Sequence, residues 1–363
     1  MNKEKGMKAG LVGLFINALL FLIKLVVGTM SHSVSIVADA MNNLSDFLSS
    51  LLTYVGFKIG QRPADKNYPF GYERFEYISG FLISILMLYI GLDVFRTGMT
   101  AIFSPVKLAV ESTMIWVMVI SILLKLLLAF YYERQFKATG SNVIKAARQD
   151  SLNDVLISMA ILLGLFMSSR FNFYIDGYLG IGIAMVIIVT SLQMIWSFIQ
   201  ELVGKRPSQQ KIDAIIEVLD YQSNIEGYHD LLIHEYGDET SFGSVHVEVD
   251  DRLSLNEAHA IIDKIERKIL NATGMDIVVH LDPIDLTSKY TKMLYDKVKS
   301  VLKNLHPDLD FHDFRIMNGV VEFDVDVFEG CILSDAEILD ALKTAVDEPM
   351  HVTFDHSSLL EKD

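Results

Sequence analysis

The sequence predicts an all-α membrane bundle of six transmembrane helices, followed by a soluble α+β region. Six apolar runs are each long enough to cross a bilayer, acidic residues gather after Pro207, and short mixed elements begin at Ser208. With 51% hydrophobic residues among 363, the chain is too apolar for a pair of ordinary soluble domains. We therefore expect a membrane domain over residues 1–207 and a soluble part after it.

Each apolar run contains about 20 residues, the length that spans the hydrocarbon core of a bilayer. The runs lie at 9–29, 34–57, 77–99, 111–131, 144–168 and 176–200. The charged N-terminus is followed by a full-length run and then by further runs. We therefore interpret the first run as a spanning helix and not as a cleaved signal.

Basic residues alternate between the loops of the predicted bundle. Lys and Arg cluster before the first run, between the second and third, between the fourth and fifth, and after the sixth, whereas the other loops carry few. Cytoplasmic loops of membrane proteins are enriched in Lys and Arg. Both termini are therefore expected in the cytoplasm of a multi-pass cell-membrane protein.

The soluble part is strongly acidic. Residues 1–207 contain 13 Asp and Glu against 18 Lys and Arg, whereas residues 208–363 contain 33 against 13. This charge excludes nucleic acid as a partner, because phosphates attract the opposite sign, and it is compatible with cations as ligands. The single cysteine, Cys331, permits no internal disulfide, which fits a cytosolic location.

Two of the predicted spans contain carboxylates. Asn42 and Asp46 lie four residues apart in the second span, so they share one face of a helix, and Asp39 lies one turn earlier. Asp150 and Asp154 repeat this spacing in the fifth span. An Asp at the bilayer centre costs about 2.5–3.5 kcal/mol, so these residues are expected to have a function. If the two faces meet, three carboxylates and one amide oxygen surround one point.

A cluster of like charges in a low-dielectric bundle is unstable by itself. It therefore binds a divalent cation or takes up protons, and competition between the two would exchange metal for protons. The alternative is that these residues only bond to neighbouring helices or lie in interfacial water. Lys24 and Lys125 also fall within spans, and we interpret both as structural, near a helix end or with the ammonium extended to the interface. Asp39 and Asp93 receive no assigned role.

Four ordered motifs resemble those of the cation diffusion facilitator family. They are Ala38-Asp39-Ala40 through Asp46, then Pro69-Phe70-Gly71 with Arg74 and Glu76, then Asp150 to Asp154, and finally Val279-His280-Leu281-Asp282-Pro283. The resemblance implies six spans, a cytoplasmic ferredoxin-like domain, a homodimer, and alternating access with proton antiport. It also implies a metal transport site formed by Asn42, Asp46, Asp150 and Asp154.

The residue types at these four positions favour manganese as the transported ion. Zinc-transporting relatives usually place at least one histidine there, and this sequence has none. Zinc favours nitrogen and sulfur ligands, whereas carboxylate and amide oxygens suit the harder Mn²⁺ ion. The Asn and three Asp resemble the arrangement in bacterial manganese exporters of the family. Zinc and iron(II) remain alternatives, magnesium is disfavoured because it gives up its waters reluctantly, and no prosthetic group is expected.

The sequence of the soluble part predicts a tandem repeat. Its short helices and strands predict the order αββαβ over residues 208–285 and again over 286–363. His229-Asp230-Leu231 is matched by His312-Asp313-Phe314, and the run 245–250 is matched by the run 321–326. We expect the first module to be a dimerisation and regulatory domain and the second to be a cytoplasmic extension of unassigned role.

Five residues of the first module match positions at which relatives in that family hold cytoplasmic metal. They are His229, His246, His259, His280 and Asp282. Regulatory metal binding that locks the dimer is the functional interpretation, and the alternative is a set of surface histidines in an acidic domain. In the second module, Glu322, Leu339 and Thr353 stand in place of His246, His259 and His280, and only His312 is retained. A duplicate metal site is therefore not expected.

Two other classes of function fit parts of the sequence. An intramembrane metalloenzyme would need a histidine beside the carboxylates as general acid or base, and the second and fifth spans contain none. A membrane-anchored metal sensor would use the soluble histidines but would not need acids in two spans. We therefore expect a transporter and not an enzyme.

Overall fold

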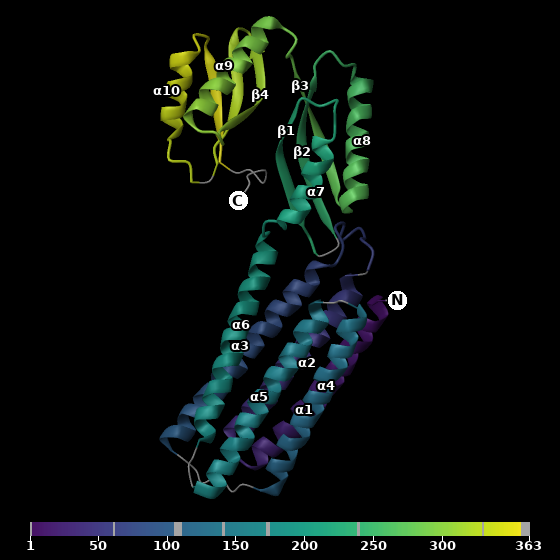
Figure 1. The fold of residues 1–363 in the computed structure, drawn as a ribbon, viewed down its shortest axis with the longest axis vertical. Helices are drawn as coiled ribbons and strands as arrows, with labels where there is room; N and C mark the ends of the chain where they lie inside the picture. The colour runs from purple at the N-terminus through teal and green to yellow at the C-terminus, as the bar shows by residue number, and fades with distance from the viewer. Residues whose placement is uncertain are drawn as a thin grey trace. The chain divides into compact units, whose positions relative to one another are not determined.

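The computed structural model describes residues 2–60, 62–104, 111–139, 142–171, 175–237, 240–328 and 330–356. The chain folds into two compact units, Met1–Val203 and Gly204–Asp363. Where it is described, the first unit is built from long helices, and the second contains six strands and four helices (Figure 1).

The first unit is a bundle of six long helices in its described residues. Each overlaps one of the predicted apolar runs, and most continue past it into polar residues. The helices are α1 (Asn2–Met30), α2 (Val34–Gly60), α3 (Arg74–Phe103), α4 (Ser112–Thr139), α5 (Asn142–Phe171) and α6 (Asp176–Val203). Five of them, all except α2, are long and apolar enough to cross a membrane. Two aspartates and two asparagines interrupt the apolar sequence of α2: Asp39, Asn42, Asn43 and Asp46.

The beginning of α2 is held by a carboxylate from α6. Asp176, the first residue of α6, accepts hydrogen bonds from the Ser33 hydroxyl at 2.7 Å and from the Val34 amide at 2.6 Å. The amide and hydroxyl of Ser35 donate to the same carboxylate. The first N–H groups of a helix have no partner within it, so this carboxylate satisfies them and complements the helix dipole. The first turns of α2 and α6 are therefore fixed to each other.

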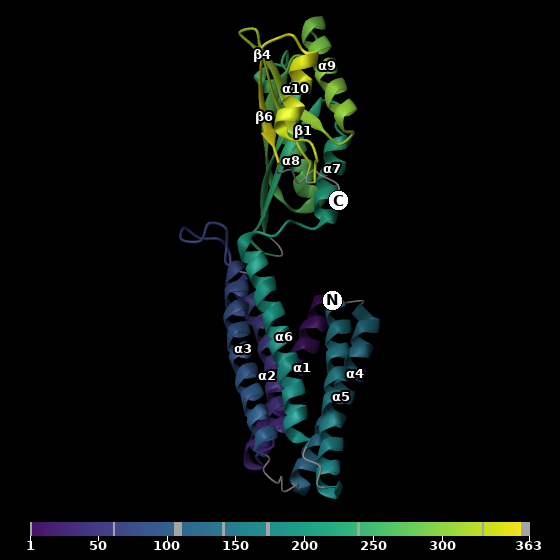
Figure 2. The ribbon, with the colours of Figure 1, turned by 90° about the vertical axis from the view of Figure 1, so that its left-hand side faces the viewer.

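Glycines bring the backbones of α3 and α6 close together. A Cβ at Gly98 of α3 would lie 2.7 Å from Cγ1 of Ile181 and 3.3 Å from the carbonyl oxygen of Gly177, both on α6. Helix association in membranes depends on close packing, which small residues permit. Figure 2 shows α3 and α6 running side by side.

The substitution Gly98→Val is expected to weaken this packing. The valine side chain would overlap Ile181 and the backbone of α6, which should lower the free energy of unfolding by about 1–3 kcal/mol. Thermal unfolding of the purified chain in detergent measures the change. Gly182→Val on α6 is the matched control, because a Cβ there meets no atom within 4 Å. Equal unfolding midpoints for the two variants would contradict the close contact.

The order αββαβ occurs twice in the second unit, once within each of the two predicted ranges. The first module contains α7 (Gln209–Asp220), β1 (Gly227–Glu235), β2 (Ser241–Asp250), α8 (Leu255–Thr273) and β3 (Asp276–Ile284). The second contains α9 (Lys289–Leu305), β4 (Asp310–Met317), β5 (Val320–Asp326), α10 (Asp335–Ala345) and β6 (Met350–Asp355). In each three-stranded sheet the first pair is antiparallel and the second pair is parallel. Two separate clusters of buried apolar side chains form the cores.

The strand register corrects one part of the repeat alignment. His229 on β1 is opposite His246 on β2, and the equivalent His312 on β4 is opposite Asp324 on β5. Asp324, and not Glu322, therefore occupies the place of His246. A slip of two residues keeps every side chain on the same face of a strand, so alternating motifs do not reveal it. The second hairpin is the shorter one and turns at Asn318 and Gly319, both with positive φ.

Candidate metal centres

The polar faces of α2 and α5 lie against each other within the bundle. Asn42 of α2 donates a hydrogen bond from Nδ2 to Oδ1 of Asp154 on α5, at 2.7 Å. Asp46 lies one turn further along α2, on the same face as Asn42. The side chain of Asp154 is 5% exposed and that of Asp46 is 30% exposed. Of these two carboxylates, Asp154 is therefore buried and Asp46 is partly accessible.

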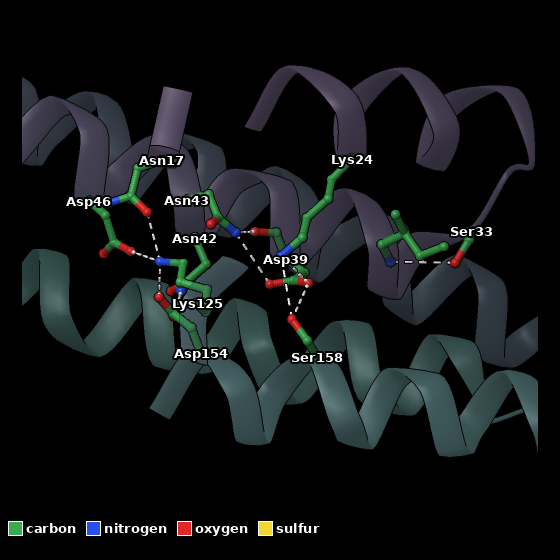
Figure 3. A network of polar contacts seen from close by, with 11 residues as sticks. Asn17, Lys24, Ser33, Asp39, Asn42, Asn43, Asp46, Lys125, Asp154 and Ser158 are labelled. Carbon is green, nitrogen blue, oxygen red and sulfur yellow. Dashed lines mark hydrogen bonds and ion pairs between the residues drawn. The ribbon is translucent and has the colours of Figure 1, made fainter. Parts of the chain in front are cut away.

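A lysine from α4 joins these carboxylates. Nζ of Lys125 contacts Oδ2 of Asp154, lies 3.2 Å from Oδ2 of Asp46, and donates to Oδ1 of Asn17 on α1 at 2.7 Å (Figure 3). The lysine side chain is only 1% exposed. The expectation that Lys125 lies near a helix end or extends to the interface is therefore wrong. Because α4 continues to Thr139, residue 125 stands near its middle, and Lys125 belongs to the same polar group as Asp46 and Asp154.

Asp150 stands apart from these contacts. It lies one turn before Asp154 on α5, its side chain is exposed, and it makes no hydrogen bond or ion pair with another described residue. Three of the four predicted transport residues are thus connected directly or through Lys125. Asp150 is the fourth, at a more accessible position on the same helix.

A second ion pair lies nearer the beginning of α2. Nζ of Lys24 on α1 is 2.7 Å from Oδ2 of Asp39, and both side chains are fully buried. Ser158 of α5 donates to the same oxygen at 3.1 Å, and Nδ2 of Asn43 donates to the backbone carbonyl of Asp39 at 2.7 Å. The alternative that the ammonium of Lys24 extends to the interface is therefore wrong, because it is fully buried against Asp39, whereas this ion pair agrees with the structural role expected for Lys24. Figure 3 shows this pair beside, but separate from, the Lys125 group.

Four of the five predicted cytoplasmic ligands gather on one face of the first sheet. The register places His229, His246 and His280 side by side on β1, β2 and β3. Asp282 follows two residues after His280, so it lies on the same face. Its Oδ2 is 2.9 Å from Nδ1 of His246, and its Oδ1 is 3.4 Å from Nε2 of His280. Ligand atoms of His246, His280 and Asp282 lie within 4.8 Å of one another, close enough to hold one metal ion.

His259 is not part of this group. Ala258, Ile262, Ile265 and Ile269 form the buried face of α8, and the side chain of His259 is exposed beside them. Among the described residues, no group of candidate metal ligands contains it.

The second module contributes residues to the same cluster. The ring of His312 stacks on that of His229 with centroids 4.0 Å apart, and Oδ1 of Asp313 lies 3.6 Å from Nε2 of His229. Burial alone would lower the pKa of His312, but a hydrogen bond to Asp326 and the charges of Asp326, Asp230 and Asp313 outweigh it and raise the pKa to about 9. Motif comparison missed this contribution because it depends on how the two modules pack, for which the sequence carries no local signal.

The chain is similar to cation transport proteins along most of its length. Residues 10–203 match the family described as the cation efflux transmembrane domain, and residues 207–284 match the cation efflux protein, cytoplasmic domain. An uncharacterized transporter of Methanocaldococcus jannaschii is 27% identical over 283 residues, which cover 78% of this chain and 99% of the relative. The cation-efflux pump FieF of Escherichia coli is 27% identical over 296 residues, which cover 80% of this chain and 98% of the relative.

Proposed function

This chain belongs to the cation efflux family of transporters, and from that membership we propose that it exports Mn²⁺ from the cytoplasm in exchange for protons. It is a transporter and not an enzyme. The proposed ligands of the transported ion are Asn42, Asp46, Asp150 and Asp154.

The hydrogen bond between Asn42 and Asp154 is the observation on which this proposal depends. It connects the polar faces of α2 and α5, and Asp46 approaches Asp154 through their shared contact with Lys125. Carboxylates inside a bilayer are costly unless they serve a function. Their meeting on two different helices favours a cation path over two unrelated structural residues.

Lys125 supplies positive charge where the transported ion is proposed to bind. A divalent ion carries twice the charge of the ammonium and contacts carboxylate oxygens directly, so it competes with Lys125 for Asp46 and Asp154. Protons compete for the same oxygens, because a protonated carboxyl is a poor ligand and a poor ion-pair partner. Loading with metal therefore favours release of protons, which supports exchange of the two.

The ligand set supports manganese over zinc. All four proposed ligands offer oxygen, which suits Mn²⁺, whereas zinc sites in proteins are usually built with histidine or cysteine. Iron(II) export by the same mechanism is the nearest alternative, since its preferences lie between the two.

We place all six helices across the membrane, with both termini in the cytoplasm and two chains forming a homodimer. The polar side chains of α2 meet Lys24 on α1, Lys125 on α4 and Asp154 on α5, and so need not face lipid. This internal pairing makes α2 compatible with a spanning position in spite of its acids. The match of residues 207–284 to the family's cytoplasmic domain supports the location of the second unit.

Metal uptake into proteoliposomes tests the proposal. Vesicles that contain the purified chain and a metal-sensitive dye are expected to take up Mn²⁺ faster than Zn²⁺ or Fe²⁺. Uptake should accelerate when the vesicle interior is more acidic than the outside, because protons then leave as metal enters. Rates that do not respond to the pH gradient would contradict antiport, faster zinc uptake would overturn the ion assignment, and no flux of any ion would contradict transport.

A further inference from the structure

A cavity of about 90 Å³ lies between the two modules of the second unit, and three carboxylates line it. Glu248 and Asp282 come from the first module and Asp313 comes from the second. The basic side chain in the wall, Arg315, is paired with Glu322 at 2.9 Å. Carboxylates that share a small cavity repel one another unless a cation or protons lie between them.

A buried histidine without hydrogen bonds stands beside this cavity. The side chain of His229 is 4% exposed, and neither ring nitrogen makes a hydrogen bond of good geometry, although Nδ1 lies 3.4 Å from Oδ2 of Asp230. Its Nε2 lies 3.6 Å from Oδ2 of Asp282 and 3.6 Å from Oδ1 of Asp313, too far for good hydrogen bonds. An unpartnered buried polar group costs about 1–3 kcal/mol, so this ring is expected to have a ligand.

The backbone turns Asp313 toward the first module. Asp313 has a φ of 56°, in the left-handed region, at an irregularity in the pairing of β4. Asp230 has a φ of 50° at the equivalent place in β1. Bulges of this kind redirect side chains, and Asp tolerates the left-handed region better than most residues. The repeated bulge therefore presents a carboxylate from each module to the histidine of the other, with Asp230 3.8 Å from Nε2 of His312.

We propose that the two modules jointly bind one divalent transition-metal ion, with His229 and Asp282 from the first module and Asp313 from the second as its ligands. Ligand atoms of these three residues lie within 4.8 Å of one another. One imidazole and two carboxylates suit an ion of intermediate hardness such as Co²⁺ or Zn²⁺. The ion gives the Nε2 of His229 the partner that it lacks and balances the carboxylates of the cavity.

This site differs from the group of His246, His280 and Asp282 because it requires the second module. Asp282 belongs to both, because Oδ1 faces His280 whereas Oδ2 lies 2.9 Å from Nδ1 of His246 and 3.6 Å from Nε2 of His229. A protonated His312 beside the site does not cancel its negative charge, because Glu248, Asp282, Asp313, Asp230 and Asp326 outnumber it. The metal ion would connect the modules, so the second module becomes part of a metal-responsive unit.

Cobalt titration of the full-length chain tests this site. Every protein in this experiment is purified in detergent and carries Asp46→Asn and Asp154→Asn, which remove the proposed membrane site. Visible absorption then measures the Co²⁺ that is bound by imidazole and carboxylate. Asp313→Asn is expected to weaken Co²⁺ binding by at least about tenfold, since it removes a direct ligand. Asparagine also tolerates the left-handed backbone at position 313, so the fold is preserved. Asp310→Asn on the same strand is the matched control, because Asp310 pairs with Lys303 and lies outside the cluster.

A second variant tests the same site without relying on correct folding of the Asp313→Asn protein. His229→Gln is expected to weaken Co²⁺ binding as strongly as Asp313→Asn does. If His229→Gln weakens binding while Asp313→Asn behaves like Asp310→Asn, the ion belongs to the first module alone and the proposal is overturned. The proposal is also overturned if neither variant changes Co²⁺ binding. Because the membrane site is absent from all these proteins, the result does not depend on whether the chain transports manganese.

Discussion

The substitution Asp154→Asn is expected to abolish metal transport, with a fall in initial rate of at least about 100-fold, because it removes a charged ligand that is held by direct contacts. Asparagine has nearly the same shape but lacks the negative charge that attracts a divalent ion. Asp154 is also the more buried of the two carboxylates that contact Lys125, so water does not replace the lost charge. Uptake of Mn²⁺ into proteoliposomes measures the effect.

Asp93→Asn provides the matched control for this experiment. Asp93 lies on α3, its side chain is exposed, and only its backbone carbonyl accepts a hydrogen bond from Thr97 among the described contacts. The same change of charge at that position should leave the rate within about twofold of the parent. A folded Asp154→Asn protein, judged by gel filtration in detergent, that transports at the rate of Asp93→Asn would contradict the assigned site.

The substitution Lys24→Met is expected to cause the largest loss of stability. It leaves the carboxylate of Asp39 fully buried without its ion-pair partner, which typically costs about 3–5 kcal/mol. The hydrogen bonds from Ser158 and Asn43 in this region remain but do not supply a positive charge. The midpoint of thermal unfolding in detergent reports the loss.

The double variant Lys24→Met with Asp39→Asn separates loss of the ion pair from loss of packing. It removes both charges, so most of the stability lost in Lys24→Met should return. Lys137→Met on α4 is the control for the change of residue type, since Lys137 is 73% exposed and its pair with Glu133 contributes at most about 1 kcal/mol. Equal unfolding midpoints for the single and double variants would show that the charge of Asp39 is not the cause.

The helices of the membrane unit were predictable because their apolar runs are long and the helical period is fixed. The i, i+4 spacing of Asn42 with Asp46, and of Asp150 with Asp154, also predicted correctly that each pair shares a helix face. The sequence did not show that Lys125 would reach these residues. The sequence pattern of a lysine within an apolar run is the same whether its ammonium extends to the interface or pairs with a residue on another helix. Only the packing of the helices distinguishes these two placements.

The cytoplasmic unit shows the same limit. The repeat of His229-Asp230 as His312-Asp313 was visible as a motif, and the order αββαβ followed from short periodic segments. Neither the stacking of the two histidines nor the slip of two residues between β2 and β5 follows from local sequence, because period-2 patterns are unchanged by such a slip. His259 was named only by resemblance, and its neighbours on α8 place it on the outer face.

The buried ammonium of Lys125 also bears on how the membrane potential acts on this protein. A charge that moves across the full potential gains or loses about 2.3 kcal/mol per 100 mV, so a carrier that returns without cargo is sensitive to the net charge of its binding residues. The proposed ligands include three carboxylates, those of Asp46, Asp150 and Asp154, and the ammonium of Lys125 offsets one of the negative charges that they carry when ionised. Because Lys125 is covalently part of α4, it cannot depart with the ion, and in the proposed exchange cycle we expect it to lower the voltage dependence of the return step.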